Sequence, residues 1–164
     1  MGSTPDAWHD FFVAATGAGA ALAGLIFVAI SINLREILPT AALVRRAGEA
    51  IVLLLMVVVV GLVGLTPGLE TGMLGGFLVG IGVFAWSWVT YVQARALRGH
   101  ANGTAGQRVA MLAVVEAATI PVVIAGLSLV VGSGGGLYWL VSAIICAVVA
   151  GVVDGWVLLV EILR

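Results

Sequence analysis

Five long, nearly continuous hydrophobic stretches divide this chain, and short connections separate them: residues 11–34, 49–65, 72–92, 109–131 and 137–162. The second stretch could begin a turn earlier, at Val44. Each is close to the ~20 residues that a helix needs to cross ~30 Å of hydrocarbon. They lack the alternation of a membrane β-barrel, and backbone groups in lipid must hydrogen-bond internally. The pattern predicts an all-α integral membrane bundle of five transmembrane helices, with residues 1–164 forming a single domain.

Basic charge is confined to alternate connections and to the C-terminus. All seven basic residues are arginines: Arg35, Arg45, Arg46, Arg95, Arg98, Arg108 and Arg164. The other two connections, residues 66–71 and 132–136, contain none. Because positive charge accumulates on the cytoplasmic side of membrane proteins, we expect the C-terminus inside and the N-terminus outside. Trp8 and Tyr138 would then both lie near the outer headgroups, where amphipathic rings are favoured.

Composition supports the membrane assignment and narrows the partners. Hydrophobic residues make up 62% of the chain and charged ones 9%, against roughly 25% charged in a typical soluble domain. The net charge of −1 offers no field to attract nucleic acid, so we expect the lipid bilayer as partner and no nucleic acid. Arginine without lysine, with abundant alanine, glycine and valine, indicates a GC-rich genome. We therefore expect a multi-pass protein of the bacterial cytoplasmic membrane.

Small residues mark the helix faces that we expect to meet other helices, because close contact drives helix association in lipid. In the first stretch these are Gly17 and Gly24. In the third, three glycines recur at four-residue spacing: Gly72, Gly76 and Gly80. The second stretch places Gly61 and Gly64 on one face with Glu49. These contacts could form within one chain, which we favour, or between chains.

Four carboxylates lie within or at the edges of the hydrophobic stretches: Glu49, Glu116, Asp154 and Glu161. At 1.5 Å per residue, Glu116 lies roughly 12 Å from Arg108 and Asp154 roughly 15 Å from Arg164. An ionised carboxylate near mid-membrane costs about 2.5 to 3.5 kcal/mol, so such a group faces the bundle, pairs with a cation or titrates. Glu116 and Asp154 are therefore candidates for a proton or cation path.

The other polar groups of the stretches gather at the predicted cytoplasmic half. Glu49 and Glu161 lie near that interface, and Ser31 and Asn33 end the first stretch at the same level. An alternative needs no transport function. Long arginine side chains can reach inward and form structural ion pairs with all four acids.

Enzyme motifs are absent from the sequence. His9 and His100 are predicted on opposite sides of the membrane and cannot share a metal ion. The single cysteine, Cys146, excludes a thiolate metal cage. No metalloprotease, nucleophile-elbow or P-loop pattern occurs. We expect no enzyme activity, no metal and no cofactor.

Three segments together resemble a family of small, mostly uncharacterised multi-pass proteins of GC-rich bacteria. They are WHDFF at 8–12, GLIFVAISIN at 24–33 and WVLLVEI at 156–162. The resemblance implies a membrane bundle but no activity. Residues 21–32 also resemble the pore helix of Orai-type calcium channels. However, Ile32 stands where that pattern needs a selectivity glutamate, and this chain has five stretches instead of four.

Two functions fit these features. The first is a homo-oligomeric channel or transport component for protons or small cations, because five helices form a thin bundle and a path would lie on an oligomer axis. The second is a non-catalytic accessory subunit that binds and regulates another membrane protein through its small-residue faces. We therefore expect either a homo-oligomer or a larger membrane complex.

Overall fold

The computed structural model describes residues 5–98 and 105–162, all-helical apart from short connections. Within these ranges, side chains are described except those of residues 5–6, 96–98, 105–111, 159 and 161–162. The elements in chain order are η1 (Pro5–Trp8), α1 (His9–Ile32), α2 (Leu34–Ile37), α3 (Ala41–Gly64), α4 (Thr71–Arg98), α5 (Ala105–Val131) and α6 (Tyr138–Ile162).

Five of these helices, α1, α3, α4, α5 and α6, are long and apolar enough to cross a membrane. This confirms the predicted all-α bundle of five membrane-spanning helices. The largest difference from the predicted bounds is in α3, which begins at Ala41, whereas the hydrophobic pattern indicated 49 or Val44. Its first two turns carry Arg45 and Arg46, which hydropathy alone excludes from a span.

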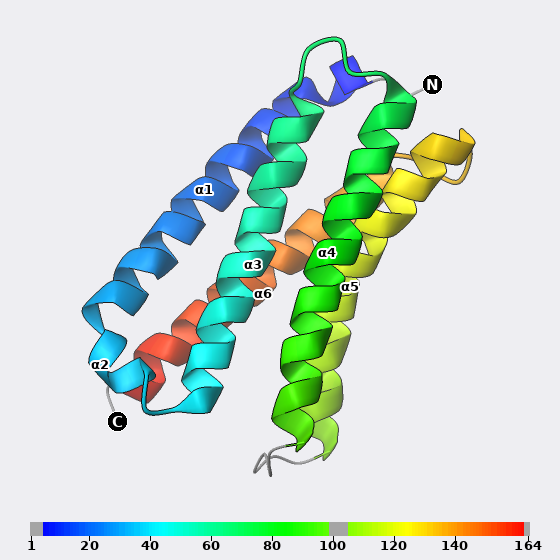
Figure 1. The fold of residues 1–164 in the computed structure, drawn as a ribbon. Coiled ribbons are helices and arrows are strands. Elements are labelled where there is room, and N and C mark those ends of the chain that lie inside the picture. The colour runs from blue at the N-terminus through cyan, green and yellow to red at the C-terminus, as the bar shows by residue number, and fades with distance from the viewer. Residues whose placement is uncertain (1–4, 99–104, 163–164) are drawn as a thin grey trace.

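The helices form two groups that α3 and α6 connect. The helix α3 packs against α1, α4 and α6, while α5 packs between α4 and α6. In Figure 1, α1 and α3 run side by side, α4 and α5 form a second pair, and α6 crosses behind α3 to reach the far end of α1.

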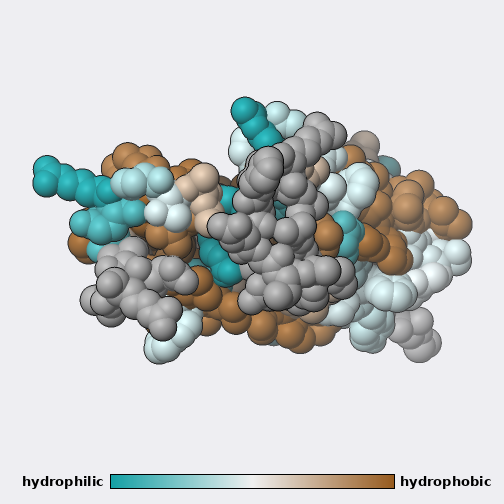
Figure 2. All heavy atoms as spheres, turned by 90° about the horizontal axis from the view of Figure 1, so that it is seen from below, coloured by the Kyte–Doolittle hydropathy of each residue, from teal (hydrophilic) through white to brown (hydrophobic). Residues whose placement is uncertain are grey.

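One end of the bundle carries the described arginines, and we call it the arginine-bearing end. Here α1 connects through α2 to α3, α4 approaches α5, and α6 ends (Figure 1). Seen from this end, teal hydrophilic atoms gather at the helix ends, while brown hydrophobic atoms cover much of the flanks (Figure 2). The fold thus brings Arg35, Arg45, Arg46 and Arg95 to one end. The side chains of Arg98 and Arg108, and Arg164 altogether, lie outside the described residues. The side of the membrane that this end occupies stays a prediction.

The opposite end is held by aromatic contacts and a glycine-rich turn. The ring of Trp8 meets that of Tyr138 edge to face, with centroids 4.9 Å apart, so the start of α1 is tied to the start of α6. In the turn before α6, the carbonyl oxygen of Gly134 accepts hydrogen bonds from Ser128 Oγ at 3.1 Å and Trp139 Nε1 at 2.8 Å. Gly134 has φ +92°, a conformation that favours glycine.

Glycines of α3 make room for side chains of α1. A Cβ atom at Gly64 would lie 2.6 Å from the ring of Phe12, which is fully buried. One at Gly61 would collide with the hydroxyl of Thr16. The predicted packing face of this helix, with Gly61 and Gly64, is therefore confirmed.

The closest helix approach is between α4 and α5, where backbone meets backbone. A Cβ atom at Gly75 would lie 2.7 Å from the carbonyl oxygen of Gly126, and one at Gly82 would lie 3.1 Å from the backbone nitrogen of Val123. Such separations require residues without side chains, as is usual at membrane helix contacts.

Candidate functional site

Two ion pairs lie near the arginine-bearing end. One lies within α3, and the other connects α3 to α6. Arg45 Nη1 lies 2.9 Å from Glu49 Oε1, one turn further along α3. Arg46 Nη1 lies 3.3 Å from Asp154 Oδ1 on α6. Because successive residues point about 100° apart on a helix, adjacent arginines serve different partners. Arg45 neutralises Glu49 within α3, and Arg46 connects α3 to Asp154 on α6.

Burial makes these pairs structural elements of the bundle. Glu49 is almost completely buried, and about four-fifths of the Arg46 and Asp154 side-chain surfaces are covered. A carboxylate in so dry a place is retained at reasonable cost only beside a cation. The arginine pairing considered from the sequence therefore occurs at Glu49 and Asp154, two of the four acids.

Glu116 has a different environment. Its Oε2 atom accepts a hydrogen bond of 2.8 Å from the indole nitrogen of Trp86 on α4. Among the side chains that the structure describes, no arginine pairs with it. Glu116 lies 11 residues into α5, roughly 16 Å from the start of that helix. Its side chain is half-buried, and Trp86 is 40% exposed, so the pair lies on the flank of the bundle, roughly 6 Å into the candidate span Leu112–Val131.

Two further polar side chains of α4, Thr90 and Gln93, follow this pair along the helix, and each has an atom without a hydrogen-bond partner in the described part of the chain. Gln93 is 5% exposed. Its Nε2 atom and the Thr90 Oγ1 atom are buried and form no hydrogen bond within the described part of the chain. Sequence reasoning missed Gln93. The spacing of Trp86, Thr90 and Gln93, at i, i+4 and i+7, is the signal that could have identified this face.

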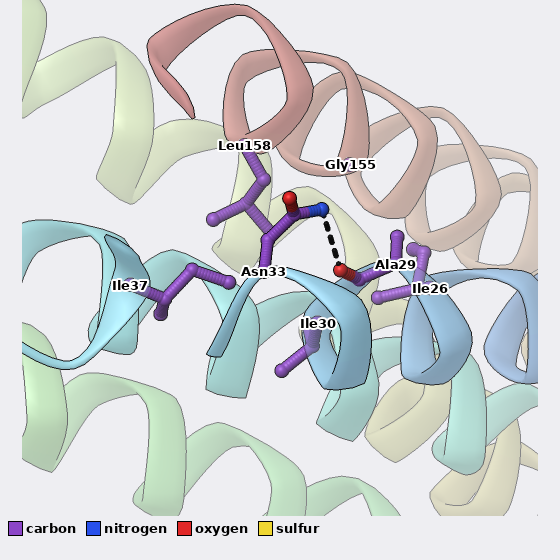
Figure 3. A pocket seen from close by; sticks show the side chains of 7 residues that line it. All are labelled: Ile26, Ala29, Ile30, Asn33, Ile37, Gly155 and Leu158. Carbon is purple, nitrogen blue, oxygen red and sulfur yellow. Dashed lines mark hydrogen bonds between the residues drawn. The ribbon is translucent and has the colours of Figure 1, made fainter. Parts of the chain in front are cut away.

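Among the described residues, Ser31 and Asn33 form hydrogen bonds with backbone groups and with no carboxylate. Ser31 Oγ donates to the Phe27 carbonyl at 2.8 Å, and Asn33 Nδ2 donates to the Ala29 carbonyl at 2.9 Å. Figure 3 shows the Asn33 amide turned back onto its own helix. These side chains satisfy backbone groups at the end of α1.

The cavity around Asn33 is small and apolar, about 10 Å³, and lies between α1 and α6 (Figure 3). Its lining residues are Ile26, Ala29, Ile30, Asn33, Ile37, Gly155 and Leu158. None of these described lining residues is a carboxylate. The remaining predicted acid, Glu161, lies in α6, but its side chain is outside the described residues.

The glycines predicted to pack helices in the first and third stretches face open space. An added Cβ atom would meet nothing within 4 Å at any of them: Gly17, Gly24, Gly72, Gly76 and Gly80. In α4, the contact with α5 uses Gly75 and Gly82 instead. The favoured contact within one chain is thus not found at these five positions among the described residues, and contact between chains stays a prediction.

Two of these glycines border an apolar groove between α3 and α4. Its volume is about 550 Å³, and its lining residues are Val52, Leu55, Met56, Val59, Gly76, Phe77, Gly80, Ile81, Phe84 and Ala85. The missing side chains of Gly76 and Gly80 help to leave this space open on the side of the bundle.

Comparison with protein-family models, with curated proteins and with solved structures yields no match. The fold defines the class: a multi-pass membrane protein with five helices that can span the bilayer.

Proposed function

We propose that this protein is a homo-oligomeric channel or transport component for protons or small cations, with Glu116 as the carboxylate on its path. The observation that carries the proposal is the position of Glu116. Its carboxylate lies within a hydrophobic span, and its described hydrogen-bond donor is the neutral indole of Trp86. An ionisable group inside a membrane span is costly and marks a functional site by default.

The exposure of the pair supports an oligomer. Glu116 and Trp86 lie on the flank of α4 and α5, where a single chain would present a carboxylate to lipid. A second copy packed over this flank would cover the carboxylate and enclose a path beside it. Asp154, by contrast, is neutralised by Arg46. The ion pair favours a structural role for it.

Flux measurements test this assignment. Purified protein in liposomes is expected to pass protons or small cations, and Glu116→Gln should lower the flux at least tenfold because the amide cannot take up a proton. Glu70→Gln is the matched control, since Glu70 is exposed in the connection before α4. Asp154→Asn should retain flux in the molecules that stay folded. Wild-type liposomes without flux, or a Glu116→Gln variant with full flux, would refute the proposal.

A second candidate function is an accessory subunit that binds and regulates another membrane protein. The observation in its favour is the open side of α4, where Gly76 and Gly80 border the groove with α3. A helix of another membrane protein could approach closely at such small residues. If the protein produces no flux in liposomes and co-purifies with a stoichiometric membrane partner, this candidate is favoured over the channel.

The accessory-subunit candidate predicts that Gly76 takes part in assembly. Gly76→Leu should reduce the complexed fraction several-fold, because leucine fills the surface where another helix approaches. The single chain should lose little stability, since a Cβ atom at Gly76 meets no atom within 4 Å and the groove beside it is open. Crosslinking in native membranes and thermal melting in detergent measure the two effects. Ala14→Leu, at an exposed position of α1, is the control. Unchanged assembly would remove Gly76 from the interface.

A further inference from the structure

Three polar groups of α4 follow one face of that helix and lead to Glu116. Trp86, Thr90 and Gln93 lie within about 60° of arc and over roughly 10 Å of helix rise. Gln93 is nearest to the arginine-bearing end, two residues before Arg95. At the other end of the row, Trp86 donates its hydrogen bond to Glu116. The row therefore extends from the arginine-bearing side of α4 to the Glu116 carboxylate.

Two members of this row carry polar atoms that protein atoms leave unsatisfied. The amide nitrogen of Gln93 and the hydroxyl of Thr90 are buried without a hydrogen-bond partner in the described part of the chain, and Gln93 is 5% exposed. Buried amides and hydroxyls in proteins are almost always paired, and buried water is the usual partner where protein atoms are not. Water can bind both atoms: its oxygen accepts a hydrogen bond from the Gln93 amide, and its O–H groups can donate to the Thr90 hydroxyl oxygen.

We propose that water molecules bound along Gln93 and Thr90 connect the arginine-bearing end to Glu116, and that the species carried to this carboxylate is the proton. This inference rests on the proposed function and names its substrate.

The chemistry of the row favours protons over metal cations. Cations such as Ca²⁺ and Mg²⁺ need several oxygen ligands around one point. The oxygen atoms of this row belong to Gln93, Thr90 and Glu116 and are spread over roughly 10 Å of helix rise. A proton needs only a chain of water. At each step one O–H bond forms as another breaks, and the last water transfers its proton to the Glu116 carboxylate. No oxidant or reductant is involved.

The first test compares fluxes in liposomes. Proton flux in wild-type protein should exceed Na⁺ and K⁺ flux, and Gln93→Leu should lower proton flux at least tenfold by removing a water ligand. Its thermal stability should change little, because leucine removes the buried amide together with its need for a hydrogen-bond partner. Ser87→Ala, at an exposed position of the same helix, should retain full flux. A Na⁺ flux equal to the proton flux, or full proton flux in Gln93→Leu, would overturn the assignment.

The second test detects water without relying on flux. Two single-cysteine variants, Thr90→Cys and Val89→Cys, are made in a Cys146→Ala background. Each folded protein is treated with Ag⁺ and then denatured and alkylated, so that only the thiols that Ag⁺ has not reached are alkylated. Val89 is fully buried in the apolar core and lies at the same depth. Ag⁺ should block alkylation at least tenfold faster at position 90 than at position 89, because a hydrated row admits the ion.

The two tests separate this inference from the proposed function. Suppose that Ag⁺ blocks alkylation equally fast at positions 89 and 90 while the flux depends on Glu116. That result would overturn the water path but leave the proposed channel function standing. Rapid blocking at position 90 in a protein without flux would support the hydrated row and overturn the transport of protons.

Discussion

The Gly126→Ala variant is expected to lose about 3 kcal/mol of stability, near the upper end of the usual cost of overpacking. The added methyl group would lie 2.6 Å from the carbonyl oxygen of Gly75 and 2.7 Å from the backbone nitrogen of Val79. Neither atom belongs to a flexible side chain that could move aside. To accept the methyl group, α4 and α5 would have to separate along their seam.

Unfolding in mixed micelles measures this loss, and the helix α4 itself offers a control. Gly80→Ala adds the same methyl group where no atom lies within 4 Å. It should leave stability unchanged or raise it slightly, because alanine favours a helix more than glycine does. Equal effects of the two substitutions would contradict the close approach of α4 and α5 at Gly126.

The Asp154→Ala variant is expected to lose about 3 kcal/mol, because removal of one partner of a buried ion pair leaves the other charge uncompensated. Here that charge is the Arg46 guanidinium, four-fifths of whose side-chain surface is covered. The neighbouring carboxylate, Glu49, already accepts hydrogen bonds from Arg45 at 2.9 and 3.1 Å. It is therefore not free to replace Asp154 fully.

Exchanging the two charges of this ion pair measures the interaction between the two residues. The double variant Arg46→Asp with Asp154→Arg keeps one acid and one base across α3 and α6, so it should recover a large part of the stability that either single change loses. Mixed-micelle unfolding of the four proteins gives the coupling between the two positions. Additive losses would show that Arg46 and Asp154 do not stabilise each other.

The candidate site could be predicted only in part from the sequence. The depth of Glu116 and Asp154 follows from counting residues, but their partners do not. Arg46 is 108 positions from Asp154, and only the packing of α3 on α6 brings them together. The role of the Trp86 indole as the donor to Glu116 depends on how α4 and α5 align.

The glycines of α4 show why helix faces are harder to predict than helices. Gly72, Gly76 and Gly80 have the regular four-residue spacing, whereas Gly75 and Gly82 are the ones that touch α5. Glycine is frequent enough in this helix to mark more than one face. The choice between these faces depends on the matching surface of α5, which contributes Gly126 and Val123.

Hydrophobicity by itself determined that five helices form, since a bilayer-length apolar stretch has no other way to satisfy its backbone. It also determined that the described arginines lie at one end, because an antiparallel chain returns to the same end at every second connection. Only the tertiary structure decided which side chains meet. Pairing of acids, contact between glycines and burial of an unsatisfied amide depend on helix rotation and offset, which local sequence does not specify.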